Sequence, residues 1–179
     1  MKRTSLILLI GIAAPVLQGA LNTFIPARFA PDLGLLGVIA LGLHWRSTAG
    51  GLVLAATLGF AADLLSGSLL GQQALLRLLV FGAARIASGH LNLRGAVPQS
   101  FFVVGITAIN ALGVALLNVF FTVGGGFDLV MLRDLLSHML VNALFASPIS
   151  RLVEIVATAF SDDEGARRAL RITPRVRST

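Results

Sequence analysis

The chain has 179 residues, of which 56% are apolar and 12% are charged, and its formal net charge is +6. Soluble domains usually carry about 25% charged residues, so this composition indicates a protein that lies largely in lipid, and it argues against a soluble enzyme or a nucleic-acid-binding domain. Cysteine is absent, which excludes disulfides, thiolate metal sites and cysteine nucleophiles.

The first hydrophobic segment runs from Ser5 to Ile25 and follows Lys2 and Arg3. A basic start before an apolar run is also the pattern of a secretory signal, with Gln18-Gly19-Ala20 as a tolerable cleavage site. The apolar run continues past that site, and five further hydrophobic segments follow it. We therefore expect a first membrane helix, with a cleaved signal as the alternative.

The second segment begins at Pro31 and Asp32. Proline at the first helical position loses no hydrogen bond, and an acid suits the positive end of the helix dipole, so this pair predicts a helix start. The strongly apolar part, Leu33 to Leu43, is too short to cross a hydrocarbon core of about 30 Å at about 1.5 Å per residue. We expect a short or re-entrant helix.

Four more hydrophobic segments follow, and turn residues separate them. Ser66-Gly67-Ser68 ends the third segment, and Gly124-Gly125-Gly126 ends the fifth. Pro148 is expected to kink the sixth, because proline removes one backbone hydrogen bond and clashes with the preceding turn. The predicted ranges are Ala49 to Leu65, Leu69 to Ser88, Phe101 to Val123 and Asp134 to Phe160.

The basic residues between the segments predict the topology. If all six segments cross and the N-terminus is cytoplasmic, only Arg28 and Arg133 of the loop arginines and lysines fall outside. Positive residues favour the cytoplasmic side of a membrane, so we expect an all-α bundle of about six short transmembrane helices with both termini in the cytoplasm. The bundle covers residues 1–160.

Residues 161–179 form a basic tail. Ser161 and Glu164 have the spacing of a capping box, which predicts a short helix from Asp162 to about Arg171. The tail is interpreted either as a contact for anionic lipid or a partner, or as a solvated segment that fixes the topology.

No pattern typical of an active site is found. The only glycine cluster lacks the lysine and hydroxyl of a phosphate-binding loop. His44, His90 and His138 lie on different segments without the spacing of metal proteases, and Asp134 and His138 share a helix face that suits capping or packing. We expect no catalytic residue, no metal and no cofactor; an intramembrane enzyme is the disfavoured alternative.

Asp63 and Arg77 lie inside predicted membrane segments, where charged side chains are costly and usually find a partner. A long arginine side chain can reach toward the membrane interface. We therefore expect an ion pair between Asp63 and Arg77 near the outer leaflet, joining the third and fourth helices. The alternative places Asp63 in interfacial water and Arg77 against backbone carbonyls.

Polar residues also recur on the last two segments. Asn110 and Asn118 lie on nearly one face of the fifth, and His138 and Asn142 lie on one face of the sixth. Antiparallel packing would bring Asn118 near the depth of His138. Such pairs add about 0.6 to 2 kcal/mol each in membranes, so we interpret them as helix-joining contacts, with a polar substrate pocket or proton path as the alternative.

Small residues at four-residue spacing let helix backbones approach closely. Ala55 and Gly59 have this spacing in the third segment, and Gly67 and Gly71 have it across the following turn. These faces could receive a neighbouring helix of the bundle or the helix of a partner.

An ordered set of these residues resembles a known family. The set consists of Pro31-Asp32-Leu33, Gly59-Phe60, and Asp63-Leu64-Leu65-Ser66-Gly67 followed by Gly71 and Ala74-Leu75. With six short spans and this length, it is similar to the rod shape-determining protein MreD family. The similarity is densest from Pro31 to Leu75 and does not extend into the tail after Ser161.

The resemblance implies a non-catalytic scaffold of the bacterial cell-elongation complex in the inner membrane. Its implied partners are an MreC-like bitopic protein, an MreB-like filament, a RodA-type glycan polymerase, a penicillin-binding transpeptidase and membrane lipids, with no nucleic acid. Candidate partner-binding or structural residues are Asp32, Asp63, Gly67, Gly71, Arg77, Asn110, Asn118, His138 and Asn142.

The family fold has been likened to the substrate-binding subunits of energy-coupling-factor vitamin transporters. A small-molecule-binding transporter subunit is therefore the alternative function. Such a subunit generally needs an outer loop that covers a polar and aromatic pocket, whereas the first outer connection here is only about Pro26 to Phe29. The chain also has one tryptophan and no tyrosine, so we expect the scaffold.

Overall fold

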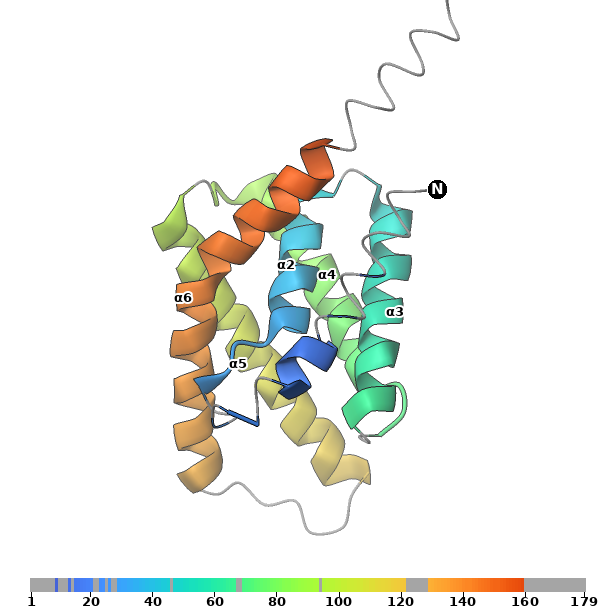
Figure 1. The fold of residues 1–179 in the computed structure, drawn as a ribbon, viewed down its shortest axis with the longest axis vertical. Coiled ribbons are helices and arrows are strands. Elements are labelled where there is room, and N and C mark those ends of the chain that lie inside the picture. Colours follow the sequence, from blue (N-terminus) through green and yellow to red (C-terminus); the bar gives the residue numbers. More distant parts are fainter. Residues whose placement is uncertain are drawn as a thin grey trace, which may run out of the picture.

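The computed structural model describes residues 9, 13, 15–20, 23–24, 26, 29–45, 47–66, 69–93, 95–121 and 129–159, and this part of the chain is helical throughout apart from its connections. Residues 15–20 are helical. The later helices are α2 (Leu33–His44), α3 (Thr48–Ser66), α4 (Gln72–His90), α5 (Ala96–Phe121) and α6 (Leu129–Ala159) (Figure 1). The predicted all-α fold is confirmed.

α2 is short, as predicted, and it packs against the four helices that follow it. Its contacts are most extensive with α4 and α6, and it also meets α3 and α5. Leu35, Val38 and Ile39 of α2 are fully buried. At 1.5 Å per residue the 12 residues of α2 rise only about 18 Å, so the surrounding helices extend well beyond its ends (Figure 1).

The hydrophobic core forms around α2 where α3 and α4 pack against each other. Phe81 of α4 is completely buried, and its ring occupies the space beside Gly51 of α3 where a side chain would otherwise point. Further along the same pair of helices, a Cβ atom on Gly59 would lie 2.5 Å from the Cα of Ala74. The predicted close approach at Gly59 is therefore confirmed, and the neighbour is α4.

α6 starts five residues before the predicted position and continues through Pro148. Figure 1 shows that it changes direction along its length, as expected for a proline inside a helix. α5 likewise starts earlier than predicted, at Ala96, and the last residue described as helical in it is Phe121. The predicted turn at Gly124 to Gly126 and the predicted tail helix lie outside the described residues.

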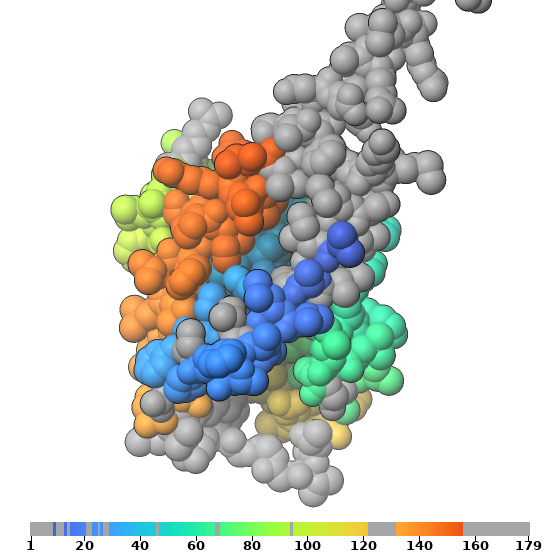
Figure 2. All heavy atoms as spheres, viewed as in Figure 1, coloured from blue at the N-terminus to red at the C-terminus, as the bar shows by residue number. Residues whose placement is uncertain are grey.

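Two of the described helices, α3 and α5, are long and apolar enough to cross a membrane. Only 33% of the apolar window of α3 and 22% of that of α5 are buried, whereas the core helix of a soluble protein would be mostly buried. Their outer faces therefore present large apolar side chains to the surroundings. Figure 2 shows one face of the molecule, with α6 at one edge and α3 at the other.

Candidate functional site

A buried polar network joins four helices at the start of α2. Asp32 caps α2, because its Oδ1 accepts a hydrogen bond of 2.8 Å from the backbone N–H of Leu35. The guanidinium of Arg77 on α4 donates to both carboxylate oxygens of Asp32 through Nη2, at 3.0 and 2.9 Å. The side chain of Arg77 is 6% exposed and that of Asp32 is 25% exposed, so the ion pair is largely shielded from water.

Asn142 of α6 extends this network to the fourth helix. Its Oδ1 accepts a 2.9 Å hydrogen bond from the backbone N–H of Asp32, and its Nδ2 donates to the Oγ1 of Thr107 on α5 at 3.3 Å. Both side chains are buried. Because each bond crosses between segments far apart in the sequence, Asn142 fixes where α6 and α5 lie relative to the start of α2.

A second carboxylate joins α3 to α4. Asp63 is 1% exposed, and it accepts hydrogen bonds from the backbone N–H groups of Gly71, Gln73 and Ala74 at 3.0, 2.8 and 3.2 Å. The first N–H groups of a helix have no partner within that helix, and the positive end of the helix dipole favours an anion. Asp63 therefore holds the start of α4 against the end of α3.

The prediction of an ion pair between Asp63 and Arg77 is wrong. Arg77 forms its ion pair with the carboxylate of Asp32. The carboxylate of Asp63 instead accepts hydrogen bonds from the backbone N–H groups at the start of α4. Arg77 lies further along α4, where that helix faces α2, so the partner comes from the central helix. The alternative interpretation, with Asp63 in interfacial water and Arg77 against backbone carbonyls, differs from the structure as well.

The other predicted polar residues are only partly brought together. Asn118 accepts a hydrogen bond of 3.4 Å from the Nε2 of Gln72 on α4, a residue that the sequence did not single out. Asn142 pairs with Thr107 and not with the asparagines of α5. Within the described part of the chain, the Oδ1 of Asn110 is buried without a hydrogen-bond partner, and His138 is half-buried on α6.

The two glycines of the predicted turn have different outcomes. Gly71 stands at the N-cap of α4 with φ at +90°, a left-handed conformation that glycine adopts without strain. Its N–H is one of the three that bind Asp63. Gly67 lies outside the described residues.

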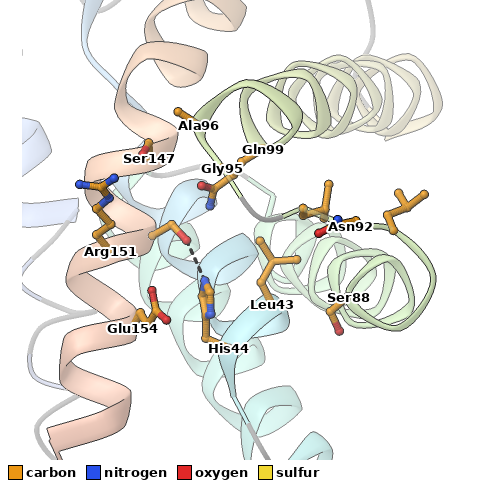
Figure 3. A pocket seen from close by; sticks show the side chains of 13 residues that line it. Leu43, His44, Ser88, Asn92, Gly95, Ala96, Gln99, Ser147, Arg151 and Glu154 are labelled. Atoms are coloured by element: carbon orange, nitrogen blue, oxygen red, sulfur yellow. Dashed lines mark hydrogen bonds between the residues drawn. The ribbon is translucent and has the colours of Figure 1, made fainter.

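A polar pocket lies at the opposite end of α2, where α4 ends and α5 begins. Its volume is about 570 Å³, and it is lined by residues of α2, α4, α5, α6 and the α4–α5 connection (Figure 3). The Nε2 of His44 and the Oγ of Ser150 lie 2.8 Å apart on its wall. No pattern in the sequence predicted this site, because its polar residues come from separate helices and share no spacing.

The pocket residues are not arranged as a metal centre. Within the described ranges, no group of three or more histidine, aspartate or glutamate side chains is close enough to hold a metal ion.

No protein-family model, no curated protein sequence and no solved structure matches the chain.

Proposed function

We propose that the chain is a non-catalytic, multi-pass scaffold of the bacterial cell-elongation complex in the inner membrane, as its resemblance to the MreD family implies. In this role it binds the transmembrane helix of an MreC-like bitopic protein. It thereby helps to position a RodA-type glycan polymerase and a penicillin-binding transpeptidase near an MreB-like filament.

The observation that carries this proposal is that the residues on which the resemblance depends form contacts between helices of the bundle. Asp32 and Asp63 direct their carboxylates to Arg77 and to the amides of α4, and Gly59 admits the backbone of Ala74. These residues hold helices together, and the carboxylates of Asp32 and Asp63 are already engaged in an ion pair and hydrogen bonds within the bundle. A set of residues that specifies a rigid bundle suits a scaffold, whose task is to present fixed helix faces.

The outer surface of α5 supports a place in the membrane and a contact with a partner helix. α5 contains no aspartate, glutamate, lysine or arginine along its 26 residues. Large apolar side chains are exposed along its length, among them Phe101, Ile109, Leu116 and Phe120. Extended apolar surface of this kind marks contact with lipid or with another protein.

The alternative function, a transporter subunit that captures a small molecule from outside, is less well supported. The polar pocket that His44 and Ser150 line lies where α2 and α4 end and α5 begins. In the proposed topology, with both termini in the cytoplasm, that end faces the cytoplasm. A subunit that captures a vitamin from outside needs its pocket at the other end.

The proposal is tested by purifying the tagged protein in mild detergent from its native membrane and identifying the bound proteins and small molecules by mass spectrometry. An unrelated multi-pass protein with the same tag is the control. Enrichment of an MreC-like bitopic protein or of elongation synthases is the expected result. Enrichment of transporter ATPase subunits, or of a bound vitamin-like compound, would replace the scaffold with the transporter subunit.

The binding face can be mapped because the chain has no cysteine. Single cysteines at Phe60 on α3, Ile109 on α5 and Leu140 on α6 place a thiol on three exposed apolar positions of different helices. Crosslinking to a partner helix that carries its own cysteine should occur from one of these helices and not from all three. Equal crosslinking from every helix would indicate random collision in the membrane.

A further inference from the structure

The buried ion pair at the start of α2 leaves one nitrogen of Arg77 unused. A guanidinium has five N–H donors, and here Nη2 serves both carboxylate oxygens of Asp32. Nη1 is buried and has no hydrogen-bond partner within the described part of the chain. An unsatisfied buried group is unfavourable, and more so when it is charged. This nitrogen therefore lacks an acceptor that the described side chains do not supply.

A buried acceptor on α5 is unused as well. The Oδ1 of Asn110 has no hydrogen-bond partner among the described residues. Thr107, one turn earlier on α5, accepts a hydrogen bond from Asn142, which in turn binds the backbone of Asp32. Asn110 therefore lies one helical turn from a chain of hydrogen bonds that ends at the ion pair of Arg77.

The turn of α5 that follows Asn110 approaches α4. An added Cβ atom on Gly113 would lie 2.6 Å from the Cδ2 of Leu76, the residue before Arg77. Asn110 is therefore enclosed on α5 between Thr107 and Gly113, and each of these is connected to the neighbourhood of Arg77. The unused donor on α4 and the unused acceptor on α5 thus face a common space, and they form no hydrogen bond with each other.

Open space lies beside these atoms on α2. Gly34 and Gly37 are three residues apart and share a face of this helix. An added Cβ atom on Gly34 would lie 3.4 Å from the Nη2 of Arg77, whereas one on Gly37 would meet no described atom within 4 Å. Seven residues after Gly37, on the same face, His44 forms a hydrogen bond with Ser150 of α6. The open side of Gly37 therefore lies between the directions of α4 and α6, where α5 packs against both.

We propose that an internal water molecule is bound in this space and joins α4 to α5. It accepts a hydrogen bond from the Nη1 of Arg77 and donates one to the Oδ1 of Asn110. An anion cannot donate to Asn110 and is repelled by the carboxylate of Asp32, whereas a cation is repelled by Arg77. Buried waters typically bind polar groups that lack other partners.

The water gives α5 a second connection to the ion pair, beside the link from Asn142 to Thr107. It also adds a polar contact between α4 and α5, which are otherwise joined by the hydrogen bonds of 3.4 to 3.5 Å from Gln72. The water site does not depend on the proposed scaffold function, which is tested by the proteins recovered from native membranes, so either proposal can fail alone.

A methyl group placed in the open space tests the proposal. Gly37→Ala and Gly105→Ala are matched, because an added Cβ atom has no described atom within 4 Å at either position. Gly105 lies on the exposed side of α5, so alanine there should raise the midpoint of thermal unfolding in detergent by about 2 to 4 °C through helix propensity. Gly37→Ala should give no rise, because the methyl displaces the water and leaves Arg77 and Asn110 unsatisfied. Equal rises would overturn the proposal.

A second substitution separates a displaced water from a change in packing. Asn110→Leu removes the acceptor and keeps a side chain of the same branched shape. In the wild-type background it should lower the unfolding midpoint, because the hydrogen bond to the water is lost. In the Gly37→Ala background it should raise the midpoint, because it removes an acceptor that has already lost its partner. The same shift in both backgrounds would show that the two positions are independent and would contradict the proposal.

Solid-state NMR of the isotope-labelled chain in lipid bilayers detects the water directly. Magnetisation should pass from water protons to the side-chain nitrogens of Arg77 and Asn110, and this transfer should fall in folded Gly37→Ala. The backbone amide of Phe81, a completely buried residue, is the reference for a site without water. The sample contains only this chain and lipid, so a hydroxyl group of a partner helix cannot produce the signal. Transfer no greater than at Phe81, or equal transfer in the two proteins, would overturn the proposal.

Discussion

Arg77 of α4 donates through one guanidinium nitrogen to both carboxylate oxygens of Asp32, at 3.0 and 2.9 Å, while the same carboxylate caps α2. Asp32 thus caps the central helix α2 and also joins it to α4 through Arg77, which is 45 residues away in the sequence. Asn142 binds the backbone of Asp32 from α6, so three helices depend on this position.

Removing one member of this ion pair should destabilise the bundle strongly. Arg77→Leu leaves Asp32 without its counter-charge, and breaking a buried pair costs about 3 to 5 kcal/mol, or somewhat less here because Asp32 is partly exposed. Asp32→Asn should be destabilising for the converse reason. The free energy of unfolding in mixed detergent measures both effects.

The double variant identifies the partner of Arg77. Asp32→Asn with Arg77→Leu should lose clearly less stability than the sum of the two single losses, because neither charge is then left unpaired. Asp63→Asn with Arg77→Leu should be closer to additive, since the carboxylate of Asp63 binds amides instead. If instead the losses were additive for Asp32 with Arg77 and less than additive for Asp63 with Arg77, the ion pair expected from the sequence would be supported.

Asp63→Ala should weaken the junction of α3 and α4. It leaves the N–H groups of Gly71, Gln73 and Ala74 without their acceptor, and one unsatisfied buried group alone costs about 1 to 3 kcal/mol. Hydrogen exchange should increase at the start of α4. Thr57→Ala, on the exposed side of α3, is the control and should change stability by less than about 0.5 kcal/mol. Equal effects of the two variants would argue against this role for Asp63.

Gly59→Ala should separate α3 from α4. The added Cβ would lie 2.5 Å from the Cα of Ala74 and 2.6 Å from the carbonyl oxygen of Gln73, so the backbones must move apart, at a cost of about 1 to 3 kcal/mol. Gly105→Ala on α5 is the matched control, because no atom lies within 4 Å of its added Cβ. There alanine should stabilise the helix by up to about 1 kcal/mol. Thermal unfolding of both variants in detergent distinguishes these outcomes.

The proposed topology predicts which positions are accessible from outside the cell. A single cysteine near Arg28 or near Phe127 should react with an impermeant thiol reagent in intact cells. A cysteine at Asn92, an exposed residue of the α4–α5 connection, should react only after the membrane is opened. Labelling of Asn92 from outside would reverse the orientation and place the polar pocket on the outer face.

The helical fold and several helix boundaries follow from local patterns in the sequence. Apolar runs separated by turn residues predicted the helices, and Pro31-Asp32 predicted the start of α2, because capping depends on residues within one turn. The close approach at Gly59 was predicted for a similar reason, since a missing side chain permits close packing wherever a neighbouring helix lies.

The partners of the polar residues depend on how the helices pack in three dimensions. Asp63 and Arg77 are close in sequence and were expected to pair, but α4 turns Arg77 toward the central helix α2, where Asp32 lies. The pocket residues His44, Gln99 and Arg151 come from three helices, and no spacing in the sequence relates them. Local patterns determine that helices form and where α2 begins, whereas the side chains that meet between helices are decided by long-range packing around α2.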